Sequence, residues 1–168
     1  DTLAYDKALR STFRENVNVI MVGEMRDYET MAAAVSAAET GHLVFASLHT
    51  NNAAQTIERI VSTFPPAQQT QIVIQLANTL SGVVSQRLIP RLKGGLIPAV
   101  EVMIATTAVR NLIREGKTLQ LNLVIETGAD VGMISLNHSL ADLVRRQEIS
   151  IDQAEFYSLN PVELKNLI

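Results

Sequence analysis

The chain has 168 residues, of which 47% are hydrophobic and 18% are charged, a composition typical of a folded domain with a core and unlike that of a disordered chain. Its formal net charge of −3 gives no general electrostatic attraction to nucleic acid, so nucleic acid is not an expected partner. The absence of cysteine excludes a disulfide framework and a thiolate metal site. No apolar stretch approaches the roughly 20 residues of a transmembrane segment, so none is expected.

The first part of the chain alternates between helical and strand patterns. These patterns follow in the order helix, strand, helix, strand, helix, over residues 4–15, 17–22, 28–39, 42–50 and 53–64. Both strand patterns are continuous apolar runs, which indicates strands buried on both faces. Two such strands joined by a helix predict a parallel βαβ unit with a right-handed connection.

The pattern changes after residue 64. Pro65 and Pro66 are typical of a helix start, and the helical spacing of apolar residues continues to about Arg87. Residues 90–99 predict a hairpin turn, and residues 100–105 predict a third strand. Beyond this strand, helices are predicted over residues 108–115, 117–127, 135–147, 151–158 and 161–168. The chain therefore divides into an α/β part, residues 1–105, and an all-helical part, residues 106–168.

Charged side chains gather where the first strand ends. In VNVIMVGEMRD, residues 17–27, the apolar run stops at a glycine and is followed by Glu24, Arg26 and Asp27. The second strand ends near His49. Because neighbouring parallel strands end at the same edge of a sheet, we expect Glu24 and His49 to lie together. A carboxylate and an imidazole at that edge are suited to orienting a water molecule and sensing a phosphate.

Two nearby residues allow different interpretations. Asp27 is also placed to cap helix 28–39, where an acid interacts favourably with the helix dipole, so its role stays open between capping and the site. His42 precedes His49 by seven residues. In one continuous strand, at about 3.3 Å per residue, the two would lie about 23 Å apart. We therefore expect His42 to serve the opposite edge of the sheet or a subunit contact.

Three segments carry a resemblance to a known family. VIMVGEMRDYET and AAETGHLVFASLHTNNAAQTIERIV resemble the Walker B segment and the His box of the secretion-type motor ATPases, and AVRNLIREGK resembles a helix specific to PilT-type pilus retraction ATPases. The resemblance implies a RecA-like parallel-sheet core. It also implies that Glu24 is the catalytic glutamate, which polarises the attacking water, and that His49 reads the γ-phosphate. His42 matches the earlier histidine of the family.

The resemblance extends to residues around the site. It implies that Arg26 and Asp27 lie beside the nucleotide or at a subunit boundary. Arg10 and Arg14, on the preceding helix, are further candidates for contact with a neighbour's nucleotide, although solvated surface charge is the stronger interpretation for both.

The segment that resembles the retraction helix has a clear apolar face. Its spacing predicts that Val109, Leu112 and Ile113 face inward and that Arg110, Arg114 and Glu115 face outward. An ordinary surface helix is the alternative interpretation, because helix propensity alone explains this pattern, whereas the resemblance implies a function in retraction for the whole motif. The motif comprises Ala108, Val109, Arg110, Asn111, Leu112, Ile113, Arg114 and Glu115.

One motif that a nucleotide motor requires is absent. The phosphate loop G-x-x-x-x-G-K-[ST] has its nearest match at Gly116-Lys117-Thr118, where Asn111 replaces the first glycine and a helix replaces the preceding strand. In the family this loop lies upstream of the segments quoted above. We therefore interpret the chain as the C-terminal part of a longer motor, without its phosphate-binding half, and expect it to be inactive alone.

The resemblance implies further properties of the intact protein. ATP and Mg²⁺ are the implied cofactors, and no residue of this chain is assigned to the metal. A homo-hexamer is expected, acting with an inner-membrane platform protein of the pilus at the cytoplasmic face of that membrane. Two alternatives remain: a non-catalytic scaffold, and an accessory paralogue of the retraction motor that binds partner subunits.

Overall fold

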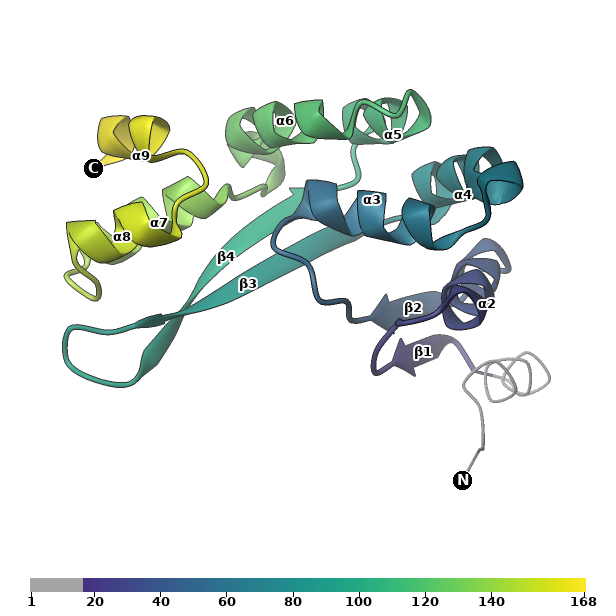
Figure 1. Ribbon diagram of the computed structural model, residues 1–168, viewed down its shortest axis with the longest axis horizontal. Coiled ribbons are helices and arrows are strands. Elements are labelled where there is room, and N and C mark those ends of the chain that lie inside the picture. The colour runs from purple at the N-terminus through teal and green to yellow at the C-terminus, as the bar shows by residue number, and fades with distance from the viewer. Residues whose placement is uncertain (1–16) are drawn as a thin grey trace.

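The computed structural model describes residues 17–168 (Figure 1). In chain order these residues form β1 (Val19–Val22), α2 (Tyr28–Glu39), β2 (Leu43–Ala46), α3 (Ala53–Thr63), α4 (Pro66–Thr79), β3 (Gly82–Pro90), β4 (Leu96–Ile104), α5 (Thr107–Arg114), η1 (Thr118–Gln120), α6 (Leu121–Thr127), η2 (Ala129–Val131), α7 (Leu136–Arg145), α8 (Ile151–Tyr157) and α9 (Pro161–Leu167). The helix predicted over residues 4–15, with Arg10 and Arg14, lies outside the described residues.

The molecule is elongated along a β-hairpin (Figure 1). A small sheet made of β1 and β2 lies at one end together with α2, and helices α7, α8 and α9 lie at the other end. Between them run the long strands β3 and β4, with α3, α4, α5 and α6 on one side. The predicted α/β architecture is therefore confirmed, although the partition at residue 106 stays a prediction.

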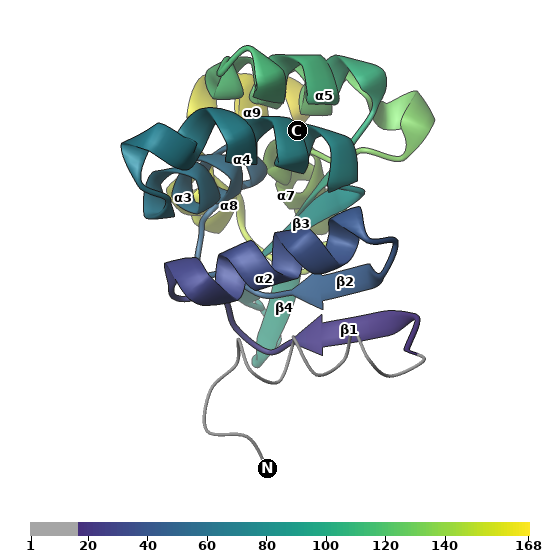
Figure 2. The same cartoon turned by 90° about the vertical axis from the view of Figure 1, so that its right-hand side faces the viewer.

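The predicted parallel βαβ unit is confirmed. β1 pairs with β2 in parallel, with Val19 opposite Leu43 and Val22 opposite Ala46. Helix α2 has the predicted bounds and lies along one face of this sheet (Figure 2). On that face Ile20 and Val22 are buried in a cluster with alanines of α2.

The opposite face of the small sheet corrects the prediction of fully buried strands. Val19, Met21, Leu43 and Phe45 are 56%, 76%, 48% and 53% exposed, and they lie in cross-strand pairs on one face. Since successive side chains of a strand point to opposite faces, α2 covers only the alternate residues. Within the described part of the chain, this face is open.

Strand β2 is also shorter than predicted. It spans Leu43–Ala46 rather than residues 42–50, because Ser47 turns toward the loop after β1. The Ser47 hydroxyl donates to the Gly23 carbonyl, and the Met25 amide donates to the Ser47 carbonyl over 3.0 Å. Residues 42–49 are therefore not one continuous strand, and the separation of about 23 Å between the two histidines, which assumed such a strand, loses its basis.

The largest error of the sequence prediction concerns residues 80–90. The helix predicted to continue to Arg87 ends at Thr79, and Gly82–Pro90 form β3, which pairs antiparallel with β4. Strand β4 starts at Leu96, earlier than the predicted residue 100. A Cβ atom at Gly82 would lie 2.8 Å from the Met103 carbonyl oxygen, so the strands approach here at a distance that only glycine permits.

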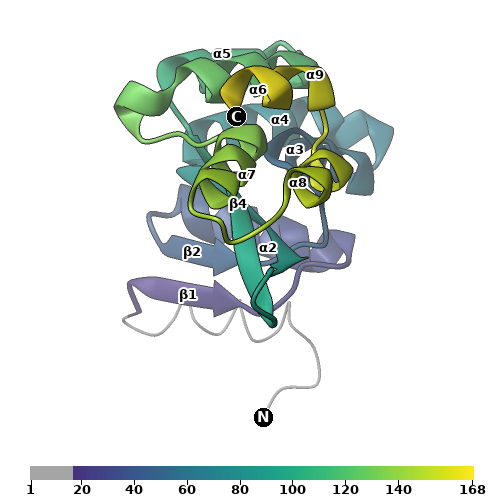
Figure 3. The same cartoon turned by 90° about the vertical axis from the view of Figure 1, so that its left-hand side faces the viewer.

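The hairpin supports the C-terminal helices (Figure 3). Ile89 and Ala99 share a buried cluster with residues of α7, α8 and α9, including Leu140 and Leu164. Three predicted helix starts carry side-chain caps: Thr106 accepts from the Val109 amide, Ser150 forms a capping box with Gln153, and Asn160 accepts from the Glu163 amide.

A buried acid joins the hairpin to α3. Glu101 on β4 is 6% exposed, and its carboxylate accepts a 2.7 Å hydrogen bond from the Ala53 amide, at the first turn of α3. Burial raises the pKa of Glu101, although the bond from Ala53 and the charge of Arg87 oppose this shift. The first-turn amides of a helix have no intrahelical partner, so Glu101 satisfies a donor that would otherwise be buried unpaired.

The Glu101 carboxylate provides a first test of the fold. Glu101→Leu should lower the free energy of unfolding by about 2 kcal/mol at pH 7, because the Ala53 amide loses its acceptor. Glu101→Gln keeps an acceptor and should cost much less.

Since the pKa of Glu101 is raised in the folded state, its ionisation disfavours folding as pH rises through the ordinary range of a glutamate. Glu101→Gln should therefore gain stability relative to the wild type between pH 4 and pH 7 in urea denaturation, and a constant difference would contradict this assignment.

Candidate active site

The loop after β1, residues 23–27, forms the edge of the candidate site and is called the rim loop below. Its backbone is held to the end of β2 by the two bonds between Ser47 and residues Gly23 and Met25. At its end, Asp27 is the N-cap of α2 and accepts a 2.8 Å hydrogen bond from the Thr30 amide. The rim loop is thus fixed at both ends, and Asp27 has the capping geometry that the sequence left open.

Three charged or titratable side chains meet at the rim loop. A carboxylate oxygen of Glu24 lies 2.5 Å from Nε of Arg26 and 3.0 Å from Nε2 of His49. The Glu24 side chain is 24% exposed, whereas the side chains of Arg26 and His49 are 77% and 85% exposed. Glu24 and His49 therefore meet at the carboxyl edge of the sheet, as the strand order predicted, and both are accessible from solvent.

The surroundings of Glu24 favour its ionised form. The hydrogen bond from Arg26 holds the pKa of the Glu24 carboxyl below its ordinary value, and the charges of Arg26 and His49 act in the same direction. A carboxylate held in this way is an acceptor that orients a water molecule well. The contact with Arg26 therefore makes Glu24 less basic than an isolated glutamate.

His42 lies apart from this group. Its Nδ1 is 3.1 Å from both the Thr40 hydroxyl and the Ala37 carbonyl, at the end of α2 and just before β2 begins. Glu24 and His49 lie beyond the other end of β2. The structure therefore places the two histidines at opposite ends of the strand, as expected, and does not bring His42 to Glu24.

The α5 helix contains the motif that resembles the retraction helix. Its apolar face is as predicted: Val109 and Ile113 are buried, and Leu112 packs against the same cluster. Gly116, with φ of +66°, ends the helix in a left-handed conformation. Ala108 and Asn111 are exposed, and Glu115 forms a surface ion pair of 2.7 Å with Lys117.

The prediction that Arg110 faces outward is wrong. Its guanidinium group donates to the carbonyls of Ala77 at 2.6 Å and Asn78 at 2.8 Å, in the last turn of α4, and to the Ala105 carbonyl at 2.9 Å. A cation at this position satisfies carbonyls that have no intrahelical partner and interacts favourably with the helix dipole. Arg114 does lie on the surface, but it bonds to the side chain of Asn78 at 2.9 Å. Together the two arginines fasten α5 to the end of α4.

The family model for "Type II/IV secretion system protein" matches residues 1–118. The chain belongs to this family. Over 154 residues it is 48% identical to "Type IV pilus retractation ATPase PilT" of Pseudomonas aeruginosa, covering 92% of this chain and 45% of that protein. It is 47% identical over 154 residues to "Twitching motility protein" of Neisseria gonorrhoeae, covering 91% of this chain and 41% of that protein.

A solved structure gives the same result. The crystal structure of the pilus retraction motor PilT with bound ADP matches this fold with a TM-score of 0.89 and 45% identity, over 99% of this chain and 47% of that one. The resemblance to PilT-type secretion ATPases and the α/β fold class are thereby confirmed. The chain spans less than half the length of the curated relatives it matches.

Other features of this secretion-family chain were not singled out from sequence. The contacts of Glu101 and Arg110 link residues far apart in the chain, and no local pattern indicates them.

Among residues 17–168, no group of three or more His, Asp or Glu side chains is arranged to hold a metal ion. Within the same range, no helix combines the length and apolar character that a membrane crossing requires.

The contacts of Arg110 give a second test. Arg110→Met keeps most of the apolar stem but removes the three hydrogen bonds, and should lower the free energy of unfolding by about 2 kcal/mol. Arg146→Met is a matched control, because Arg146 forms only a surface pair of 3.4 Å with Asp142, worth about 0.5 kcal/mol or less. Urea denaturation followed by circular dichroism measures both. Equal effects of the two substitutions would show that Arg110 does not hold α4.

Proposed function

We propose that this chain supplies the water-activating half of the ATPase site of a motor that couples ATP hydrolysis to type IV pilus retraction. The single observation that carries the proposal is the contact of Glu24 with His49 at the edge of the parallel sheet, in a chain 48% identical to a PilT protein over 154 residues. The fold similarity to a pilus retraction motor with bound ADP supports a nucleotide as the ligand.

In this proposal each rim residue has a distinct task. Glu24 orients the attacking water and accepts its proton. His49 lies 3.0 Å from the same carboxylate and responds to the γ-phosphate. Binding of a phosphate beside His49 would therefore change the contact that His49 makes with Glu24. Arg26 contacts the same carboxylate and lowers its pKa, which favours the ionised form that can accept a proton. Asp27 keeps the rim loop at the start of α2 through its capping bond.

The residues present do not by themselves form a complete nucleotide or Mg²⁺ site. The sequence has no phosphate loop, and the described residues include no metal-binding group. In the proposed motor, ATP is bound by residues beyond this chain, and we assign Mg²⁺ no contact with the residues of this chain. The chain alone is therefore proposed to be inactive.

The proposal also covers the assembly. The whole motor would be a homo-hexamer at the cytoplasmic face of the inner membrane, working on a platform protein of the pilus. The motif on α5 would take part in retraction through its firm attachment to α4 rather than as a free surface helix, because Arg110 and Arg114 both bond to the end of α4.

The role of Glu24 is tested in the complete motor. Glu24→Gln keeps the shape of the side chain but removes the base, and should lower the rate of ATP hydrolysis by a factor of about 10²–10⁴ while nucleotide binding is retained. Glu29→Gln removes an exposed acid from the first turn of α2 and is the control for charge. Turnover at the wild-type rate in Glu24→Gln would refute the assignment. A complete wild-type protein that binds its partners but hydrolyses nothing would favour the scaffold alternative.

The two histidines should behave differently in the same protein. His49→Ala should change the catalytic step without altering ring assembly, because His49 contacts Glu24. His42→Ala should act indirectly, because its ring contacts Thr40 and Ala37 at the other end of β2, and its effect should vary with protein concentration if it perturbs assembly. ATPase rate against protein concentration, with light scattering for ring size, separates the two. A concentration-dependent effect of His49→Ala would contradict this division.

A further inference from the structure

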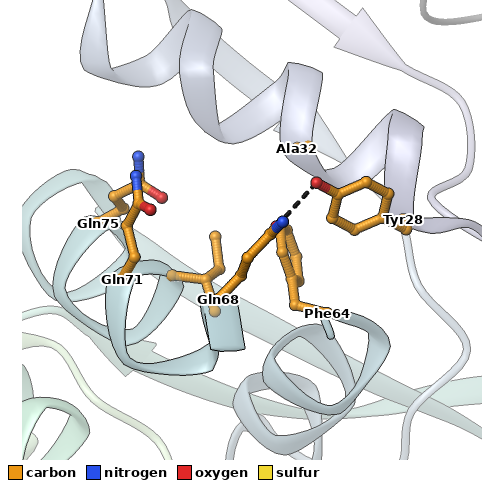
Figure 4. A pocket seen from close by; sticks show the side chains of 7 residues that line it. Tyr28, Ala32, Phe64, Gln68, Gln71 and Gln75 are labelled. Carbon is orange, nitrogen blue, oxygen red and sulfur yellow. Dashed lines mark hydrogen bonds between the residues drawn. The ribbon is translucent and has the colours of Figure 1, made fainter. Parts of the chain in front are cut away.

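The space between α2 and α4 is incompletely filled. A pocket of about 160 Å³ separates the two helices and is lined by Tyr28, Ala32, Phe64, Gln68, Gln71, Ile72 and Gln75 (Figure 4). Beside this pocket, buried side chains of both helices, including Met31 of α2 and Leu76 of α4, meet in one apolar cluster, and polar side chains add hydrogen bonds between the helices.

Two hydrogen bonds join α2 to α4 through side chains that line this pocket. At the rim-loop end, the Tyr28 hydroxyl donates to the side-chain carbonyl of Gln68 at 2.8 Å (Figure 4). At the other end, the side-chain amide of Gln75 donates to the Glu39 carboxylate at 2.7 Å. Both bonds join α2 to α4, but only the first involves the residue that directly follows the rim loop.

Tyr28 also belongs to the apolar cluster that supports the site. Its ring meets the buried ring of Phe64 edge-on, with 5.0 Å between the centroids and 77° between the planes. Met25 and Leu48 pack against the same cluster. These two residues are the chain neighbours of Glu24 and His49, so one cluster supports both partners of the Glu24–His49 contact.

We propose that Tyr28 is a positioning residue: by joining the first turn of α2 to Phe64 and Gln68, it fixes the rim loop and hence the contact of Glu24 with His49. The effect of Tyr28 on catalysis rests on the proposed role of Glu24, whereas its effect on the position of the rim loop does not. Tyr28 is assigned no contact with Glu24 or with a reacting group. It acts through Met25, which carries the backbone bond to Ser47, and through the cap at Asp27.

The test measures local opening of the rim loop in the full 168-residue chain by amide hydrogen exchange. Tyr28→Phe keeps the ring and removes the hydroxyl, and should speed exchange of the Met25 amide about fivefold. Tyr28→Leu also removes the edge-on ring contact and should speed it about 30-fold. Gln68→Ala removes the same bond from the other side, so it should match Tyr28→Phe, and the double variant should add little to either.

Gln75→Ala is the matched control. It removes the corresponding bond at the other end of the pocket, and should speed exchange of the Thr40 amide while leaving Met25 within about twofold of the wild type. A second measurement follows the titration of the Glu24 carboxyl by carbon-13 NMR. The pKa of Glu24, lowered chiefly by Arg26 and also by His49, should rise toward its ordinary value in Tyr28→Phe and stay constant in Gln75→Ala.

Two results would overturn the proposal. In one, Tyr28→Phe and Gln75→Ala affect Met25 equally. In the other, all amides of α2 and α4 accelerate together, which indicates general destabilisation. Because these measurements need no nucleotide turnover, the outcome is independent of the ATPase assay. If Glu24→Gln hydrolyses ATP normally while the exchange pattern is as expected, the proposed function fails and the positioning role of Tyr28 stands.

Discussion

The parallel pairing of β1 with β2 is the constraint on which the candidate site depends. Four residue pairs set the register, and α2 is the connection that makes a parallel arrangement possible. Since both strands run toward the same edge, residues that follow them in sequence are brought together. A slip of one residue would move His49 by about 3.3 Å along the strand and reverse the faces of β2, removing Val44 from the cluster under α2. The bonds of Ser47 to the rim loop extend this register beyond the last paired residues.

Local signals were sufficient for much of the fold. Helix α2 has its predicted bounds because its cap, its alanine-rich body and its final Thr40-Gly41 break all agree. The β3 strand was missed because Val83 and Val84 fit a helical stripe as well as a strand. What decides between these is the pairing of Val83 with Met103 and of Val84 with Val102, which are contacts between residues far apart in the chain. A periodicity read within one segment does not contain that information.

The site shows the same division. The positions of Glu24 and His49 follow from the order of the strands, so the sequence predicts that the two side chains meet. The apolar pattern of β1 indicates two covered faces, but burial is set by what packs against a strand, and α2 covers only one face in the described chain. Glu101, Arg110 and Tyr28 each bond to a helix more than 30 residues away. A charged or polar residue gives no sign in sequence of such a partner, so all three resemble ordinary surface or edge residues until the fold is known.

The attachment of Arg110 to α4 has a mechanical consequence. Helix α4 has 14 residues and is therefore about 21 Å long. One end is held by the guanidinium group of Arg110, and Gln68, near the other end, bonds to Tyr28. A tilt of α5 that leaves these bonds intact must carry α4 with it as a stiff rod. The motif on α5 and the first turn of α2 therefore share α4 as a common rigid support.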